Sequence, residues 1–444
     1  MSVIACSQQL SLFCRKAQGL GPTAANSQRS EVWEAVTTNP THAYSALMKS
    51  LHKNISVLAV CALMITLQSS QAQTFTVIHN FTGREDGGQP EYVAINPAGI
   101  LYGTTALDQY GTVFKLKQVN SSWVLSTLFA FNVYSGTGPS APAVSTDGTL
   151  YGAASSGGQA DFGTAYILRP PPGVCRSISC NWTQTVIHEF MGNGDGIDPS
   201  LGPPLLDRSG NVYGTTGSGG AHIAGTVYEL TSSGGSWTES ILYSFTGRPN
   251  AANPLWNVVP DGAGNFYGVG SGGGTLNWGS LFELSPSGSG WTESLLYSFQ
   301  PNSDVGLIPS GGLARDAAGN LYGTTTNEGP YGYGTVFEFS PFNGGTISPL
   351  YAFSSYGSTS ALTIGPDGGI YGTSDVDGLY SKGAVFKLTH TSSGWIYTSL
   401  HDFTGGRDGG YPYCNVVFDS SGNLYGTALE GGAYQNGVVW QITP

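Results

Sequence analysis

The chain has 444 residues, of which 66 are glycine, 12% are aromatic and only 10% are charged. This aromatic content argues against a disordered chain, and abundant glycine with few charges is typical of short strands joined by tight turns. From Thr74 onward, 11 Lys and Arg stand against 26 Asp and Glu, a net charge of −15. That charge, without any basic run, argues against nucleic acid and anionic membranes as partners.

The N-terminal region differs in character from the rest. Residues 1–47 contain no strand-like repeat, and we interpret them as a start-site artefact or a disordered extension. Residues 48–72 begin with lysines, continue with an apolar run and end in small residues, which is the pattern of a secretory signal peptide. We therefore predict that translation starts at Met48 and that the protein is secreted or periplasmic, with no stable membrane span after cleavage. An uncleaved anchor or a buried helix remains the alternative.

From residue 73 the chain repeats four phrases in a fixed order. The tyrosine of the phrase "LYGT" and its near copies recurs seven times, at Tyr102, Tyr151, Tyr213, Tyr267, Tyr322, Tyr371 and Tyr425. Phrases such as "GTVFKL" and "LYSF" follow it, and an Asp-x-x-Gly-Asn turn often precedes it. Each phrase is short, rich in aliphatic and aromatic residues, and bounded by turn residues, which is the signature of a strand.

Four strands per repeat and seven repeats predict an all-β protein, a seven-bladed β-propeller of four-stranded antiparallel blades over residues 73–444. In strand order A to D, "LYGT" is strand B. The mature chain opens with an isolated D strand at 74–81 and ends with an isolated C strand at 437–442. We expect the N-terminal strand to pair with the C-terminal blade and close the ring. An open solenoid of stacked hairpins is the alternative.

The combined pattern "GTVFKL … W … LYSF … G..DG..P … D..GNLYGTT" resembles the GloVer-type (Gloeo/Verruco) tandem repeat of exported bacterial proteins. The resemblance covers essentially all of residues 74–444. It implies a propeller-like fold and an extracellular or surface location, and it implies no established reaction. Many members carry a C-terminal anchoring signal, whereas this chain ends at Pro444, so we expect a released or periplasmic protein.

We interpret the recurrent aromatic residues as structural, because a residue present in every blade most simply builds every blade. The glycine of "LYGT" is expected to admit the neighbouring blade. His79, His188 and His401 occupy equivalent D-strand positions on different blades, and we interpret them as half-buried replacements for Tyr or Phe.

The connections from strand D to strand A are acidic and rich in glycine. They could bind calcium through Asp86, Asp195, Asp198 and Asp408, although Asp-Gly turns that bond their own backbone are the alternative. In an oxidising compartment, Cys175 and Cys180 could form a disulfide. We expect no other cofactor or metal.

The connections from strand B to strand C differ most between repeats, and in a propeller they share one face with the D-to-A connections. Aromatic side chains beside carboxylates suit a glycan or a protein ligand, and ordinary loop composition is the alternative. The candidate ligand-binding residues are Asp108, Tyr110, Trp278, Glu328, Tyr331, Tyr333, Asp375, Asp377, Tyr380, Glu430 and Tyr434.

No nucleophile elbow or phosphate loop is present in the sequence. The sequence therefore favours a monomeric, non-catalytic binding or scaffold module. A carbohydrate-active enzyme, a lyase or glycoside hydrolase with loop carboxylates around the axis, is the alternative.

Overall fold

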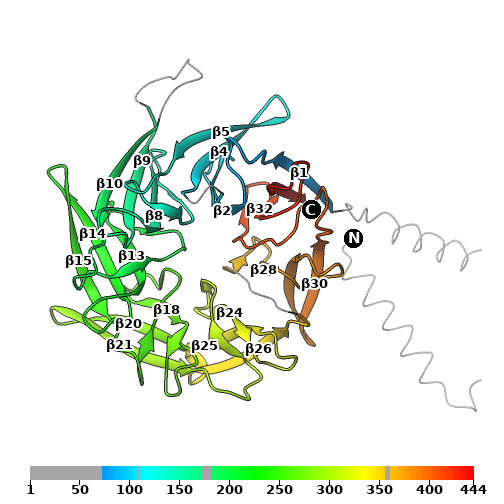
Figure 1. Ribbon diagram of the computed structural model, residues 1–444. Helices are drawn as coiled ribbons and strands as arrows, with labels where there is room; N and C mark the ends of the chain where they lie inside the picture. The colour runs from blue at the N-terminus through cyan, green and yellow to red at the C-terminus, as the bar shows by residue number, and fades with distance from the viewer. Residues whose placement is uncertain (1–72, 108–109, 172–181, 356–360) are drawn as a thin grey trace, which may run out of the picture. The chain divides into compact units, whose positions relative to one another are not determined.

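The computed structural model describes residues 73–107, 110–171, 182–355 and 361–444. These residues form a ring of small antiparallel sheets, and their regular structure is strand apart from one 3-10 turn at Pro341–Asn343 (Figure 1). Seven of the sheets are the blades of a β-propeller, as predicted. No helix in the described part of the chain is long and apolar enough to cross a membrane. The predicted extension and signal peptide, residues 1–72, lie outside the described residues.

Each blade has the predicted order, from an innermost strand A to an outermost strand D. The B strands are β3 (Leu101–Thr105), β8 (Leu150–Ser156), β13 (Val212–Ser218), β18 (Phe266–Gly270), β24 (Leu321–Asn327), β28 (Ile370–Ser374) and β32 (Leu424–Ala428). The C strands are β4 (Thr112–Val119), β9 (Thr164–Arg169), β14 (Thr226–Ser233), β20 (Ser280–Ser287), β25 (Thr335–Ser340), β29 (Ala384–Thr391) and β33 (Val438–Thr443). The D strands are β5 (Ser122–Ala130), β10 (Thr183–Glu189), β15 (Ser236–Ser244), β21 (Gly290–Ser298), β26 (Thr346–Ala352), β30 (Gly394–Asp402) and β1 (Thr74–Asn80).

The A strands around the axis are short or broken into two pieces. They are β2 (Pro90–Ile95), β6 (Thr137–Pro139) with β7 (Ala143–Val144), β11 (Ile197–Pro199) with β12 (Leu205–Leu206), β17 (Val259–Pro260), β22 (Leu307–Pro309) with β23 (Ala314–Arg315), β27 (Thr363–Ile364) and β31 (Val417–Phe418). A two-stranded sheet of β16 (Ala251–Ala252) and β19 (Gly272–Gly273) adds to the fourth blade. We number the blades in chain order, so that blade 1 is β2–β5 and blade 7 is β31–β33 completed by β1.

The two ends of the propeller close the ring as predicted. Strand β1 pairs antiparallel with β33, which places Phe75 opposite Ile442 and Val77 opposite Trp440. The aromatic ring of Phe75 also stacks on His401 of blade 6, with 3.6 Å between ring centroids. The closing strand therefore completes blade 7 and contacts the preceding blade, which leaves β33 with no open edge.

Aromatic pairs join each blade to the next. The glycine of "LYGT" lies beneath the C-strand aromatic of its own blade: a Cβ on Gly214 would lie 2.2 Å from the hydroxyl oxygen of Tyr228. The ring of Tyr228 then meets Phe190, which follows the D strand of the preceding blade. The expectation that this glycine admits the neighbouring blade was therefore wrong. It admits a ring of its own blade, and that ring contacts the neighbour. The inter-blade pairs are Phe81–Phe114, Phe131–Tyr166, Phe190–Tyr228, Phe245–Phe282, Phe299–Phe337, Phe353–Phe386 and Phe403–Trp440.

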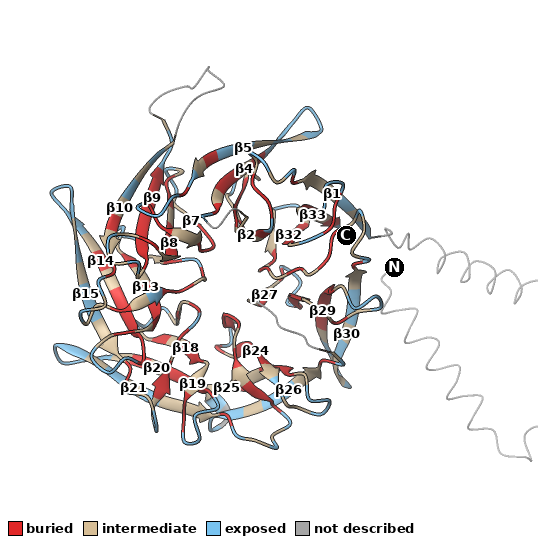
Figure 2. Ribbon diagram, in the orientation of Figure 1, coloured by how far each residue is buried: buried red, intermediate tan, exposed pale blue. Residues whose placement is uncertain are grey.

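The tyrosine of "LYGT" makes a second inter-blade contact. Tyr102 packs edge-on against Trp182 of the next blade, and Tyr425 packs against Trp123 across the closure. Tyr425 also donates a hydrogen bond to Asp419, whose carboxylate accepts the backbone N–H of Asn423 in the Asp-x-x-Gly-Asn turn. One tyrosine thus fixes both the turn and the blade interface, which confirms its structural interpretation. Figure 2 shows buried residues concentrated in the middle strands of the blades and exposed ones along the rim and loops.

Candidate functional site

The D-to-A and B-to-C connections contact each other, as expected if they share one face of the propeller. The N–H of Leu107 donates to the carbonyl of Gly88, and Glu430 forms an isolated bridge with Gly410. We call this the loop face. The opposite face carries the A-to-B turns and the C-to-D hairpins.

The candidate aromatic residues of the loop face are exposed but dispersed. Five of the six lie on the B-to-C loops of five different blades, with exposed fractions between 37% for Tyr110 and 66% for Tyr331. Tyr333 differs, because it is partly buried and packs against a hydrophobic cluster. None of the predicted aromatic residues lines the axial cavity described below. The exposed set is Tyr110, Trp278, Tyr331, Tyr380 and Tyr434.

The candidate carboxylates of the B-to-C loops mainly hold neighbouring loops in place. Glu328 accepts the N–H of Asn302 at 2.7 Å, and buried Asp377 accepts the hydroxyl of Ser354 at 2.8 Å. Asp375 is partly buried on the same loop as Asp377, and Asp108 lies outside the described residues. Glu430 is exposed at the loop surface. Glu328 and Asp377 thus have structural roles, and none of the described candidate acids of these loops lines the axial cavity described below.

The cavity on the loop face lies at the propeller axis, where the A strands meet. Its volume is about 560 Å³. Its wall combines serine and asparagine side chains with a larger apolar surface, and Asp198 is the one carboxylate among its lining residues. The lining side chains come from several blades, and include Ser155, Ser156, Asp198, Ser200, Leu201, Ser218, Asn253, Leu255, Trp256, Ser271, Ser310 and Tyr413.

Two serines at equivalent A-strand positions give this cavity its chemical character. Ser200 and Ser310 each follow the proline that ends the first inner segment of their blade, Pro199 of β11 and Pro309 of β22. Their hydroxyl oxygens are buried and make no hydrogen bond to any residue that the structure describes. Buried polar atoms are almost always hydrogen-bonded. These two hydroxyls lie just beneath the cavity surface, and a rotation of the serine side chain would let water or a ligand in the cavity bond to them.

Trp256, one of the lining residues of the cavity, is held in place by its neighbours. Trp256 packs edge-on against Tyr92, with 5.8 Å between centroids, and both rings are almost fully buried. Thr215 of blade 3 donates to the carbonyl of Trp256 at 3.1 Å, which fixes the segment. Gly202 leaves room for the ring of Trp256, because a Cβ there would lie 2.7 Å from it.

A separate cavity of about 300 Å³, lined mainly by apolar A-strand side chains such as Val93, opens elsewhere around the axis.

Three of the calcium candidates are held by their own loops. Asp86 accepts the N–H of Thr82, Asp408 that of Thr404, and Asp195 that of Met191, at 2.8–2.9 Å. These bonds match the alternative of a self-bonded Asp-Gly turn. Asp198, the fourth candidate, lies at the axial cavity, where partial burial raises the pKa of its carboxyl group.

The equivalent histidines do stand where Tyr or Phe stands in other blades, as predicted. His79, His188 and His401 are partly buried, and each packs edge-on against the phenylalanine two residues later. Sequence reasoning missed that each also pairs with the aspartate seven residues later. The Nε2-to-carboxylate distances are 3.4 Å to Asp86, 3.5 Å to Asp195 and 3.2 Å to Asp408.

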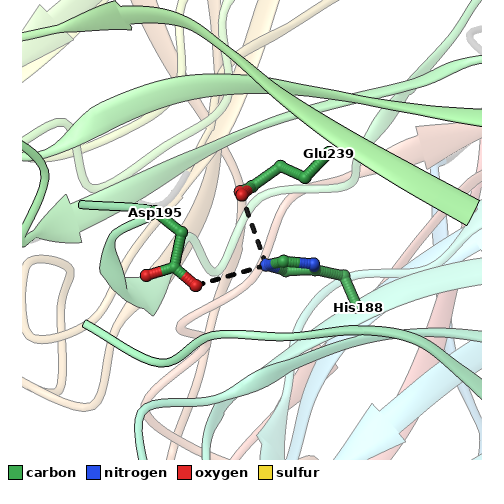
Figure 3. A group of neighbouring side chains, drawn as sticks. All are labelled: His188, Asp195 and Glu239. Atoms are coloured by element: carbon green, nitrogen blue, oxygen red, sulfur yellow. Dashed lines mark ion pairs between the residues drawn. The ribbon is translucent and has the colours of Figure 1, made fainter. Parts of the chain in front are cut away.

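At His188 a third group joins the pair (Figure 3). Glu239, from strand β15 of the next blade, places a carboxylate oxygen 3.5 Å from Nε2 of His188. Burial, reinforced by the charge of Asp195, raises the pKa of Glu239 to about 8, and burial lowers the pKa of His188. Among the described residues, this is the single group of three His, Cys, Asp or Glu side chains whose ligand atoms lie within 4.8 Å of one another.

From residue 73 onward, the cysteines are the predicted disulfide pair and one further residue, Cys414. Cys175 and Cys180 lie outside the described residues. Cys414 is free and fully buried, in a bend before β31, and its sulfur accepts the N–H of Thr427 at 3.3 Å. Burial raises the pKa of its thiol to about 11, so this cysteine is an inert core residue.

The fold and its repeated inter-blade contacts define the class of the protein, a closed seven-bladed β-propeller built from one tandem repeat. The chain matches the Gloeobacter/Verrucomicrobia repeat over residues 107–319, 173–373 and 309–444, and it belongs to this family. The match confirms the resemblance inferred from the repeated phrases.

Solved structures with similar folds include two lyases. A streptogramin B lyase structure aligns with a TM-score of 0.53 and 12% identity, covering 84% of this chain and 99% of that chain. A catalytically inactive virginiamycin B lyase from Staphylococcus aureus, in complex with quinupristin, aligns with the same values. Identity this low shows a common fold alone. No curated protein matches the chain.

Proposed function

We propose that this protein is an exported binding module that holds a neutral, hydroxyl-rich ligand, a glycan, in the axial cavity of the loop face. The observation that carries the proposal is the pair of buried hydroxyls, Ser200 and Ser310, on the cavity wall without a partner in the described protein. A sugar offers hydroxyl groups that both donate and accept hydrogen bonds, and apolar ring faces that pack against side chains such as Leu255 and Trp256.

Charge narrows the class of ligand. The chain carries a net charge of −15 from Thr74 onward, and Asp198 adds a carboxylate at the cavity. An anionic polysaccharide would be repelled by this field, whereas a neutral or cationic glycan would not. The predicted signal peptide at residues 48–72 would place the module outside the cytoplasm, where such glycans are found.

The catalytic alternative has less support. Glycoside hydrolysis uses two carboxyl groups separated by roughly 5–10 Å across the scissile bond. Among the residues lining the axial cavity, Asp198 is the only carboxylate. Two of the candidate acids of the B-to-C loops, Glu328 and Asp377, hold neighbouring loops in place.

A glycan array and a polysaccharide-degradation screen of the purified protein would test the proposal. The informative variant is Ser200→Ala/Ser310→Ala, which removes both hydroxyls with little change in volume. At about 1 kcal/mol per hydrogen bond, the double variant should bind the ligand roughly 30-fold more weakly. The matched control is Ser240→Ala/Ser294→Ala, because these serines are exposed on the D strands at the rim.

Thermal unfolding separates binding from folding in this experiment. Removing an unpartnered buried hydroxyl should leave the Tm unchanged or raise it. Lost binding with an intact Tm would support the cavity as the site. Full binding by Ser200→Ala/Ser310→Ala, or a protein ligand recovered in place of a glycan, would contradict the proposal, and release of cleaved product would establish the enzyme alternative instead.

A further inference from the structure

The group of His188, Asp195 and Glu239 lies at the rim between blades 2 and 3, on a contact that recurs around the ring. A phenylalanine follows every D strand, as Phe190 follows β10 and Phe245 follows β15. His188 lies two residues before Phe190, and Glu239 lies six residues before Phe245. The same two positions define an equivalent pair at each of the other junctions between blades. The pairs are His79–Leu125, Phe129–Gln184, His188–Glu239, Tyr243–Glu293, Tyr297–Ile347, Tyr351–Tyr397 and His401–Phe75.

Two of these pairs are aromatic contacts between blades. Tyr351 stacks on Tyr397 and His401 stacks on Phe75, which joins neighbouring blades through aromatic rings. Glu293 also has a structural role, because it accepts the N–H of Ala251 at 2.7 Å and thereby holds the D-to-A loop of the preceding blade. That loop has Asn250 where four of the other loops have an aspartate, at Asp86, Asp195, Asp304 and Asp408. A glutamate at this position is therefore explained where the loop lacks its own aspartate.

Glu239 has no such role to fill. The loop that it faces is held by its own aspartate, since Asp195 accepts the N–H of Met191 at 2.8 Å. Glu239 thus adds a second carboxylate beside a histidine that already faces one. The Nε2 atom of His188, Oδ1 of Asp195 and Oε1 of Glu239 are buried and form no hydrogen bond to any described residue.

The spacing of these groups fits a metal ion better than a hydrogen bond. Nε2 of His188 lies 3.5 Å from an oxygen of Asp195 and 3.5 Å from an oxygen of Glu239, beyond ordinary hydrogen-bond length. Ligands about 2.0–2.1 Å from a tetrahedral zinc ion lie roughly 3.3–3.4 Å from one another. Small side-chain rotations would bring all three atoms within reach of one ion (Figure 3).

We propose that His188, Asp195 and Glu239 bind one divalent transition-metal ion, which links blades 2 and 3 at the rim. One imidazole nitrogen and two carboxylate oxygens suit zinc, cobalt, nickel or manganese, whereas calcium and magnesium take oxygen ligands. The remaining coordination positions would be filled by water. The ion would balance two carboxylates held in a largely buried site, and its site is separate from the axial cavity.

Titration of the purified protein with Zn²⁺ in competition with a chelator would measure the site, and Co²⁺ absorption would report its coordination. We expect the parent protein to bind one ion per chain, and we expect Glu239→Gln to bind zinc at least tenfold more weakly. The matched control is Glu293→Gln, the same substitution on the next D strand. The second control is His401→Gln, which removes the histidine of a junction that has no third ligand.

His188→Phe is a second variant. The fold should tolerate it, because Phe129 occupies the equivalent position in blade 1. Zn²⁺ should raise the Tm of the parent protein and of both controls, but not that of Glu239→Gln or His188→Phe. Equal zinc affinity in the parent and Glu239→Gln, or no zinc-dependent rise in Tm of the parent, would overturn the proposal. Millimolar Ca²⁺ reproducing the shift would overturn the assignment of the ion class.

Discussion

Replacing Glu91 by glutamine should stabilise the propeller at pH 8 and leave its stability at pH 4 unchanged. Glu91 follows Pro90 at the start of the inner strand β2 and is partly buried. Burial raises the pKa of its carboxyl group from 4.5 to about 7. The folded state therefore holds a proton that the unfolded chain releases, and the free energy of unfolding falls as the pH rises from about 4.5 through about 7.

The structure sets the size of this effect. A pKa difference of this size corresponds to about 3 kcal/mol at 1.36 kcal/mol per unit, and partial access of water to the side chain reduces it to about 2 kcal/mol. Glutamine resembles the protonated carboxyl group in size and never ionises. Glu91→Gln should therefore gain about 2 kcal/mol at pH 8, equivalent to a rise in Tm of roughly 3 °C for a domain of this length.

Urea and thermal unfolding at pH 4, 6 and 8, followed by tryptophan fluorescence, would measure the difference between the parent protein and Glu91→Gln. Glu85→Gln is the matched control, because Glu85 is exposed in the adjacent D-to-A connection. A gain that grows from pH 4 to pH 8 only in Glu91→Gln supports the reasoning. Equal stability of Glu91→Gln and the parent at pH 8, or a loss at that pH, would refute it.

Three further predictions concern the repeat, the ring and the export segment. Gly214→Ala should cost about 1–3 kcal/mol in chemical denaturation because the new Cβ would clash with Tyr228, whereas Gly290→Ala, with open space around it, should not. Deleting residues 73–81 should expose the edge of β33 and produce aggregates or oligomers in size-exclusion chromatography, while a monomeric product of normal stability would contradict the closure. Expression from Met48 in an exporting bacterium should yield a protein whose N-terminus lies near Gln73 by mass spectrometry, and peptides from residues 1–47 in the natural protein would contradict the predicted start.

The sequence was sufficient for the fold because the contacts that build it are repeated. The phrase containing Tyr425 carries the turn bond to Asp419 and the packing against Trp123, and these same letters recur around the chain. The number of copies of this phrase therefore equals the number of blades. The phase of the repeat, a D strand first and a C strand last, located the closure at β1 and β33.

The candidate sites could not be predicted because they depend on single residues brought together from different blades. In the sequence, Ser200 and Ser310 cannot be distinguished from other serines. They line one cavity because the A strands of different blades meet at the axis. Glu239 and Glu293 both lie in the phrase "WTES", yet Glu293 holds a loop and Glu239 faces a histidine. A comparison of D-to-A loops, which shows Asn250 in place of an aspartate, is the one signal that separates them.

The most direct test of the proposed function is a crystal structure of the protein with a glycan selected by the array. We expect the ligand in the axial cavity, with its hydroxyl groups bonded to Ser200 and Ser310 and a ring face against Leu255 or Trp256. A glycan bound instead at the exposed tyrosines of the B-to-C loops, with the axial cavity holding only water, would contradict the account.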